Sequence, residues 1–145
     1  SLVAVQDGGR LAGHILFTEV KVSGHTLLAL APLSVLPDAQ NQGVGGKLIR
    51  EGHSIAAALG YKGSIVLGHA GYYPKFGYVP ASRYHISAPR FRTNPLWQLN
   101  CWKTGCTVYG ASWSIQGNFL SKLKRIKGGK PYEWFPSFFE IKLVL

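Results

Sequence analysis

The sequence has no methionine, only two cysteines and only six acidic residues among its 145 positions. Cys101 and Cys106 are too few for a disulfide framework and indicate no metal site, so a cytoplasmic protein without a bound metal is expected. No apolar run reaches the roughly 18 residues that a membrane-spanning helix needs, and we expect no membrane partner. No secretory signal peptide is visible ahead of the first strand-like segment.

Acidic residues are scarce relative to basic ones, since 16 Lys and Arg against 6 Asp and Glu give a formal net charge of +10. Such an excess is compatible with binding nucleic acid or an acidic ligand. The densest positive run is 122–130, and all four tryptophans lie in the same part of the chain, beyond Asn94. A non-catalytic binding module that uses this basic, aromatic-rich tail is therefore one function class that the sequence leaves open.

A glycine-containing turn joins a strand-like segment to a helix-like segment in the first half of the chain. The turn, 40–45, lies between an apolar run over 27–36 and an amphipathic run over 46–59. Backbone N–H groups at a helix start have no acceptor inside the helix, and the helix dipole adds partial positive charge. Gly43 and Gly45 would let a phosphate group approach the backbone closely. The segment therefore predicts a diphosphate site.

The spacing of the glycines excludes the two commonest phosphate loops. Lys47 follows two glycines and precedes Leu48, whereas a Walker loop needs G-x-x-x-x-G-K-[ST]. A dinucleotide fingerprint needs G-x-G-x-x-G, which this segment does not contain. The pattern that fits is Q-x-x-G-x-G, read as Gln40, Gly43 and Gly45. It resembles the pyrophosphate loop of the GNAT acetyltransferases, which hold acetyl-coenzyme A.

Three further segments carry the same resemblance. Residues 72–78 resemble the second GNAT signature, usually an aromatic residue followed by Tyr-x-x-x-Gly-Phe, and the two signatures are separated by about one helix and one strand, as in the family. Residues 33–38 resemble the strand that runs into the loop. Residues 66–69 are similar to one small bacterial branch of predicted acetyltransferases. The resemblance covers residues 1 to about 92.

The resemblance implies an α+β fold, the acyl-CoA N-acyltransferase fold, present in part, with a mixed central sheet and flanking helices in three layers. Hydrophobic periodicity in this chain predicts the individual elements. Strands are expected over 2–5, 11–22, 26–35 and 64–67, and helices over 45–59 and 71–76. Gly60 and Gly77 are expected to end the two helices.

The resemblance also implies which residues bind acetyl-coenzyme A. The strands that end at Val35 and Leu67 would splay apart, and the pantetheine arm would lie between them. The modest basic excess of the first 94 residues, nine basic against four acidic, suits a coenzyme with three phosphate groups. The expected coenzyme contacts are Leu33, Val35, Gln40, Gln42, Gly43, Val44, Gly45, Gly46 and Lys47.

The implied reaction is direct transfer of the acetyl group from acetyl-coenzyme A to a primary amine in a ternary complex. Tyr73 aligns with the residue that protonates the leaving thiolate, and a phenol of pKa about 10 stays protonated at neutral pH; the alternative is that its ring only packs. A backbone N–H near Val35 would polarise the thioester carbonyl. Glu19 is the carboxylate candidate for the general base and His69 is next, while deprotonation through water would need neither.

The chain is expected to divide into a GNAT core over 1–94, incomplete at its N-terminus, and an atypical tail over 95–145. A full GNAT domain has one strand and two helices ahead of the first hairpin, so elements that shape the acceptor groove are expected to be missing. The chain as given is therefore expected to be a poor or inactive enzyme, or the remnant of one. A back-translation of 97–121, moved by one base, resembles the missing family ending. We therefore interpret the tail as out of frame, with a divergent extension as the alternative. Without family strands, we expect the sheet edge beyond Ile86 to be uncovered.

The expected partner is an amine acceptor, and a small molecule, a peptide N-terminus and a protein lysine all fit. Nucleic acid is not an expected partner, because an out-of-frame basic run would never have been selected to bind anything. A homodimer stays open as well, since an uncovered strand edge favours association.

Overall fold

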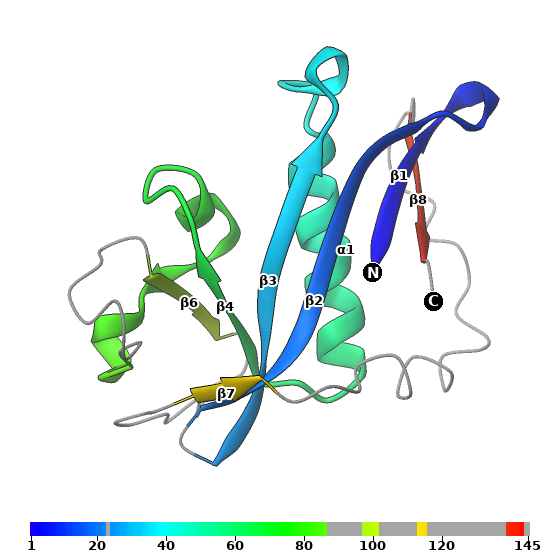
Figure 1. Cartoon of the computed structure of the whole chain (residues 1–145). Helices are drawn as coiled ribbons and strands as arrows, with labels where there is room; N and C mark the ends of the chain where they lie inside the picture. Colours follow the sequence, from blue (N-terminus) through cyan, green and yellow to red (C-terminus); the bar gives the residue numbers. More distant parts are fainter. Residues whose placement is uncertain (23, 87–96, 102–112, 116–138, 144–145) are drawn as a thin grey trace.

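The computed structural model of the chain describes residues 1–22, 24–86, 97–101, 113–115 and 139–143 (Figure 1). Its strands are β1 (Leu2–Gln6), β2 (Leu11–Val22), β3 (His25–Val35), β4 (Gly63–Leu67), β5 (Val79–Pro80), β6 (Trp97–Cys101), β7 (Trp113–Ile115) and β8 (Phe139–Leu143). Its helix is α1 (Val44–Ala58), and its 3-10 turns are η1 (Asp7–Gly9), η2 (Pro37–Ala39), η3 (Tyr73–Phe76) and η4 (Ala81–Tyr84).

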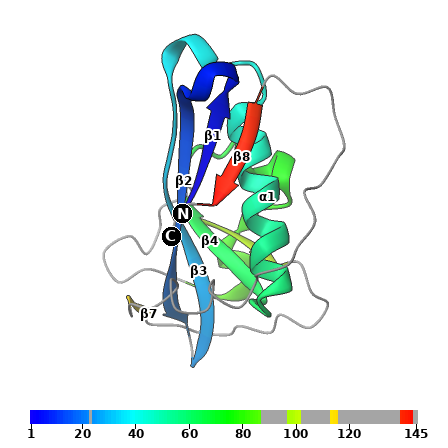
Figure 2. The ribbon, with the colours of Figure 1, turned by 90° about the vertical axis from the view of Figure 1, so that its right-hand side faces the viewer.

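The described strands form one mixed sheet. Their order is β5-β6-β4-β3-β2-β1-β8, and β7 pairs with the far end of β2. Within the described part of the chain only β3 and β4 run parallel, and α1 is the crossover that a parallel pair requires. The helix lies against one face of the sheet (Figure 2). This is the mixed α+β arrangement that the sequence predicts.

Helix α1 begins and ends within one residue of the predicted bounds. Leu48, Ile49 and Ala56 form its buried face, and Gly60 takes a left-handed conformation (φ 88°) just after its end. The predicted helix over 71–76 is wrong in type, because only the 3-10 turn η3 forms there. Pro74 near its start and the left-handed Gly77 directly after it leave no room for an α-helical turn. No helix in the described ranges is long and apolar enough to cross a membrane.

The main core lies between α1 and the sheet. Phe17 of β2 is 2% exposed and packs directly on the helix backbone at Gly52. A Cβ atom on Gly52 would lie 2.2 Å from Cε2 of Phe17, a distance that no real side chain tolerates. The glycine in the middle of α1 therefore lets the helix approach β2 closely, at the cost of some helix propensity.

The expectation that no strand covers the sheet edge beyond Ile86 is wrong, because backbone pairing continues there. β6 pairs with β4 from Gly63 to Leu67, on the edge away from β3, and β8 pairs with β1. Strand pairing uses main-chain N–H and C=O groups, which nearly any sequence supplies, so the weak side-chain pattern of the tail did not predict it. The frame of the tail and the boundary near Asn94 stay predictions.

Candidate functional site

The site begins where two neighbouring strands separate. β3 and β4 pair only from Leu28 to Leu30, opposite Ser64 to Val66, and then diverge (Figure 1). β3 continues to Val35 while still paired with β2 on its other edge. The register between β2 and β3 shifts near this point, where β3 carries one extra residue, and such a bulge bends a strand.

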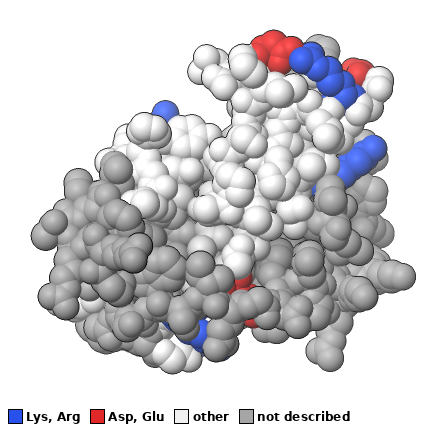
Figure 3. Space-filling model, in the orientation of Figure 1, with Lys and Arg blue, Asp and Glu red and all other residues white. Residues whose placement is uncertain are grey.

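The free edge of β3 presents backbone groups to this gap. The N–H of Leu36 donates to the carbonyl of Ala12 on β2, at 2.8 Å. Because backbone groups alternate along a strand, those of Leu33 and Val35 face the opposite way, toward the gap. These are the two β3 positions that the sequence predicts to bond the pantetheine arm. Figure 3 shows the molecular surface hollowed on this side, with uncharged atoms along the hollow.

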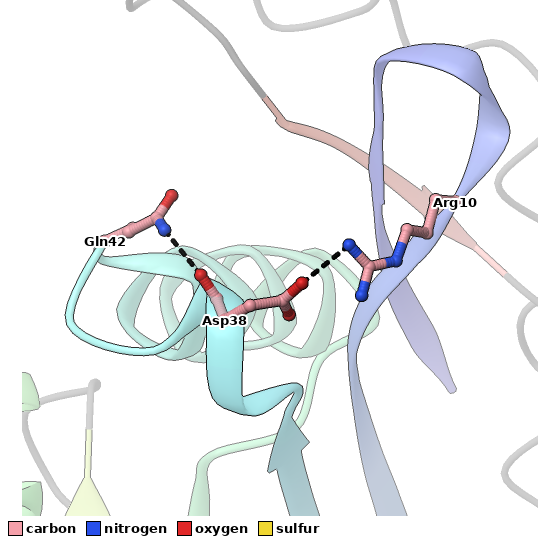
Figure 4. Close-up of polar contacts among 3 residues, drawn as sticks. All are labelled: Arg10, Asp38 and Gln42. Atoms are coloured by element: carbon pink, nitrogen blue, oxygen red, sulfur yellow. Dashed lines mark hydrogen bonds and ion pairs between the residues drawn. The ribbon is translucent and has the colours of Figure 1, made fainter.

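Side chains of the loop after β3 fold back on its own backbone (Figure 4). Gln40 Nε2 donates to the carbonyl of Val35 at 3.0 Å, and Gln42 Nε2 donates to the carbonyl of Asp38 at 2.7 Å. The carboxylate of Asp38 pairs with Arg10 at 2.6 Å. Both of these charged side chains are more than half exposed, so solvent weakens the pair and it contributes little to stability. Gln40 and Gln42 therefore shape the loop rather than point away from it.

The start of α1 has the features of an anion site. Gly43 takes a left-handed conformation (φ 81°) at the N-cap, and no described side chain caps the helix there. The first helical hydrogen bond runs from the N–H of Lys47 to the carbonyl of Gly43, at 3.0 Å. The N–H groups of Val44, Gly45 and Gly46 therefore have no acceptor within the helix. The first turn holds no acidic residue that would repel an anion.

Gly45 and Gly46 have a second role, which sequence reasoning did not find. A Cβ atom on Gly45 would lie 2.8 Å from the hydroxyl of Tyr72, and one on Gly46 would lie 3.2 Å from Cε1 of Phe76. The two glycines thus allow η3 and the residue before it to pack on the helix start. The guanidinium of Arg50 lies over the Phe76 ring, 5.6 Å from its centroid, on the same side.

Tyr73 lies on the β4 side of the gap. It is 9% exposed, and its ring packs on Gly68, where a Cβ atom would lie 2.2 Å from its Cε2. The rings of Tyr72 and Tyr78 meet it at centroid distances of 5.2 Å and 5.5 Å. Burial raises the pKa of Tyr73, and the neighbouring Tyr72 raises it further. Tyr73 is therefore a protonated phenol at neutral pH.

The structure places Glu19 on β2, well along the strand from the residue that pairs with Val35. Glu19 lies on β2 opposite Leu28, and its carboxylate accepts a hydrogen bond from the hydroxyl of Tyr61, just after α1. Gly13, the β2 residue that pairs with Val35, is six positions away, which is about 20 Å along a strand. His69 is exposed between β4 and η3, and its carbonyl accepts the N–H of Tyr72 at 3.0 Å.

Sequence reasoning missed a buried polar cluster beside Tyr73. The hydroxyls of Ser64 and Tyr78 lie 2.6 Å apart, and Nε2 of His53 lies 2.9 Å from the Tyr78 hydroxyl. Burial lowers the pKa of His53 to about 4, so its ring is neutral at pH 7. One signal was available, because Tyr78 stands where the GNAT signature usually has Phe.

Comparisons with known proteins agree on one family. The sequence profile of the acetyltransferase (GNAT) domain matches residues 1–80. The uncharacterized N-acetyltransferase YjhQ of Escherichia coli K12 is 44% identical over 86 residues, which cover 57% of this chain and 47% of YjhQ. The uncharacterized N-acetyltransferase YhbS of the same strain is 32% identical over 87 residues, which cover 59% of this chain and 52% of YhbS.

Two solved structures share the fold. A GNAT family acetyltransferase from Brucella melitensis, in complex with acetyl-CoA, has a TM-score of 0.61 and 32% identity, covering 79% of this chain and 64% of that one. YhbS from Escherichia coli, in complex with CoA, has a TM-score of 0.67 and 25% identity, covering 86% of this chain and 68% of that one. The chain spans about half the length of the curated relatives it matches. The match of the domain profile to more than half of its residues shows that the chain belongs to the GNAT acetyltransferase family.

Proposed function

We propose that this chain binds acetyl-coenzyme A between β3 and β4 and transfers the acetyl group to a primary amine by direct attack in a ternary complex. The observation that carries the proposal is the divergence of β3 and β4, with an uncapped helix start at one end and Tyr73 on the facing side. The Brucella and Escherichia relatives were solved with acetyl-CoA and CoA, which supports the same class of ligand here.

The coenzyme contacts follow from the backbone. The diphosphate accepts hydrogen bonds from the N–H groups at the start of α1, with Lys47 adding charge. The pantetheine arm bonds to the backbone of Leu33 and to the N–H of Val35 along the edge of β3 that faces the gap, as an added strand would, while the carbonyl of Val35 accepts Gln40 Nε2. Gln40 and Gln42 act indirectly, because their side-chain amides hold the loop in shape.

Acyl transfer needs a neutral amine, a donor for the developing oxyanion and a proton for the leaving thiolate. The amine nitrogen bonds to the acetyl carbon, the carbon–sulfur bond breaks, and the hydroxyl of Tyr73 gives its proton to the sulfur. The amine loses its proton to water, and Glu19 stays a candidate for the general base. Its carboxylate accepts a hydrogen bond from the hydroxyl of Tyr61, and it lies six positions along β2, about 20 Å, from Gly13, which pairs with Val35.

A binding module built on the basic run 122–130 is the second function class. That run lies outside the described residues, and no observation on the described ones favours it. The acceptor, whether a small amine, a peptide N-terminus or a protein lysine, is not named by the geometry. A homodimer likewise stays a prediction.

Replacing Gly43 by Ala should weaken coenzyme A binding about tenfold, because a Cβ atom disfavours the left-handed conformation by roughly 1–2 kcal/mol and the loop loses its shape. Gly60→Ala is a matched control, since Gly60 has the same left-handed conformation (φ 88°) and equally open surroundings at the other end of α1. Both variants should melt at similarly lowered temperatures. Calorimetric titration with coenzyme A should show weaker binding in Gly43→Ala alone, and equal affinities in the two variants would remove the loop from the site.

A further inference from the structure

A buried polar cluster stands directly behind Tyr73, and the proposed reaction makes no use of it. Ser64 belongs to β4, His53 to α1, and Tyr78 follows η3, so three separate elements meet there. Ser64 is 0% exposed and Tyr78 is 1% exposed. Buried hydroxyl groups are costly unless they are hydrogen-bonded, and these two satisfy one another.

The hydrogen bonds of the cluster are consistent with a neutral histidine. The hydroxyl of Tyr78 has one proton to donate and lone pairs to accept with. His53 and Ser64 can each donate to the Tyr78 oxygen, and either one of them can instead accept the proton of Tyr78. In every arrangement the Tyr78 oxygen has one partner on the helix and one on the sheet, which fixes the position of its ring.

The ring of Tyr78 is in turn one wall of the Tyr73 pocket. The two rings meet edge to face, with an interplanar angle of 74° and a centroid distance of 5.5 Å. The backbone of Gly68 forms another wall of this pocket. The ring of Tyr72 forms a third wall, with its centroid 5.2 Å from that of Tyr73. A shift of the Tyr78 ring would therefore move the Tyr73 ring.

We propose that Tyr78, held by Ser64 and His53, is a positioning residue that fixes the hydroxyl of Tyr73 for proton transfer to the departing sulfur. The inference rests on the proposed function, because it needs Tyr73 to act as the acid. The hydroxyl of Tyr78 is a feature of this chain, since the GNAT signature usually has Phe there. The ring alone fills the space, and the hydroxyl adds the two hydrogen bonds that fix it.

The kinetic test uses the full chain, acetyl-coenzyme A and hydroxylamine, a small amine that is largely uncharged at neutral pH and needs no shaped acceptor groove. Release of the coenzyme thiol above the rate without protein reports the transfer, because hydroxylamine also cleaves thioesters unaided. Tyr78→Phe should lower kcat about tenfold, because a displacement of about 1 Å can cost as much as 100-fold. The Kd of coenzyme A should stay within about twofold. Tyr84→Phe, a half-buried tyrosine of η4 that packs in a different cluster, is the matched control and should leave kcat unchanged.

A double-mutant cycle separates this inference from the proposed function. If Tyr78 acts through Tyr73, then Tyr73→Phe/Tyr78→Phe should be no slower than Tyr73→Phe alone. The positioning role would be overturned, and the acid role left standing, if Tyr73→Phe lowers kcat but Tyr78→Phe does not. The same holds if the two losses of kcat add up in the double variant. No loss in Tyr73→Phe would overturn both.

Two further measurements separate positioning from stability. Tyr78→Phe/Ser64→Ala removes both hydroxyls, so no buried hydroxyl is left without its partner, and its melting temperature should recover in part, because His53 still lacks Tyr78, while kcat stays low. Recovery of kcat along with the melting temperature would contradict the inference. In the coenzyme-free protein, NMR should show the Tyr73 ring flipping at least tenfold faster in Tyr78→Phe, and an unchanged flip rate would also overturn it.

Discussion

Replacing Tyr73 by Phe should lower kcat for acetyl transfer to hydroxylamine roughly 100-fold, which is the lower end of what a general acid contributes. The ring still fills its place between Gly68, Tyr72 and Tyr78, so the fold and the coenzyme site should be kept. The lost proton matters only as the carbon–sulfur bond breaks. The effect should therefore fall on kcat, with the Kd of coenzyme A nearly unchanged.

Single-turnover measurements should accompany this comparison, because product release limits kcat in many enzymes and would hide a slower chemical step. Burial raises the pKa of Tyr73, so ionisation of its phenol should not lower the wild-type rate as the pH rises from neutral toward mildly alkaline values. An unchanged chemical rate in Tyr73→Phe would leave Tyr73 as a packing residue. Tyr84→Phe controls for a general effect of removing a phenol hydroxyl.

The free energy of unfolding should decrease by about 3 kcal/mol as the pH falls from about 6.5 to about 4, because of His53 alone. Burial lowers the pKa of His53 in the folded chain to about 4, against about 6.5 when unfolded. Between these values the unfolded chain binds a proton that the folded chain does not, so stability rises with pH. Each pKa unit between the folded and unfolded chains is worth about 1.4 kcal/mol of unfolding free energy, so this difference in the pKa of His53 gives about 3 kcal/mol.

Urea unfolding at several pH values measures this dependence. His53→Gln should lower stability at pH 7, because the contact with the Tyr78 hydroxyl changes, but it should remove most of the slope between pH 4 and pH 6.5. His25→Gln, at an exposed histidine at the start of β3, should keep the wild-type slope. Equal slopes in His53→Gln and the wild type would show that His53 is not buried as a neutral ring.

The strand and helix pattern of the first half of the chain could be predicted because local chemistry decides it. The alternation over Leu11–Val22, the apolar face of α1 and the glycine at position 60 are read directly from residue types. The predicted helix over 71–76 is instead the 3-10 turn η3, since Pro74 and Gly77 act within four residues of each other. Its aromatic contacts were beyond prediction, because they depend on how η3 packs on α1.

In the site as well, local motifs could be predicted from the sequence, whereas contacts between distant residues could not. Gly43 and the free N–H groups of α1 follow from a local motif, and the structure places them at the end of a diverging pair of strands. The position of Glu19 follows from strand register, which no local pattern specifies once both faces are partly buried. The cluster of Ser64, His53 and Tyr78 joins residues far apart in the sequence, so only the folded chain reveals it.

Amide NMR mapping shows where coenzyme A binds without needing an acceptor. We expect the largest shift changes on the backbone amides of 43–47, at the start of α1, and on those of Leu33 and Val35, at the edge of β3 that faces the gap. The turn Asp7–Gly9, at the tip of the first hairpin, should be unaffected. Changes concentrated in the basic run 122–130, or no change in 43–47 at saturating coenzyme A, would contradict the proposed function.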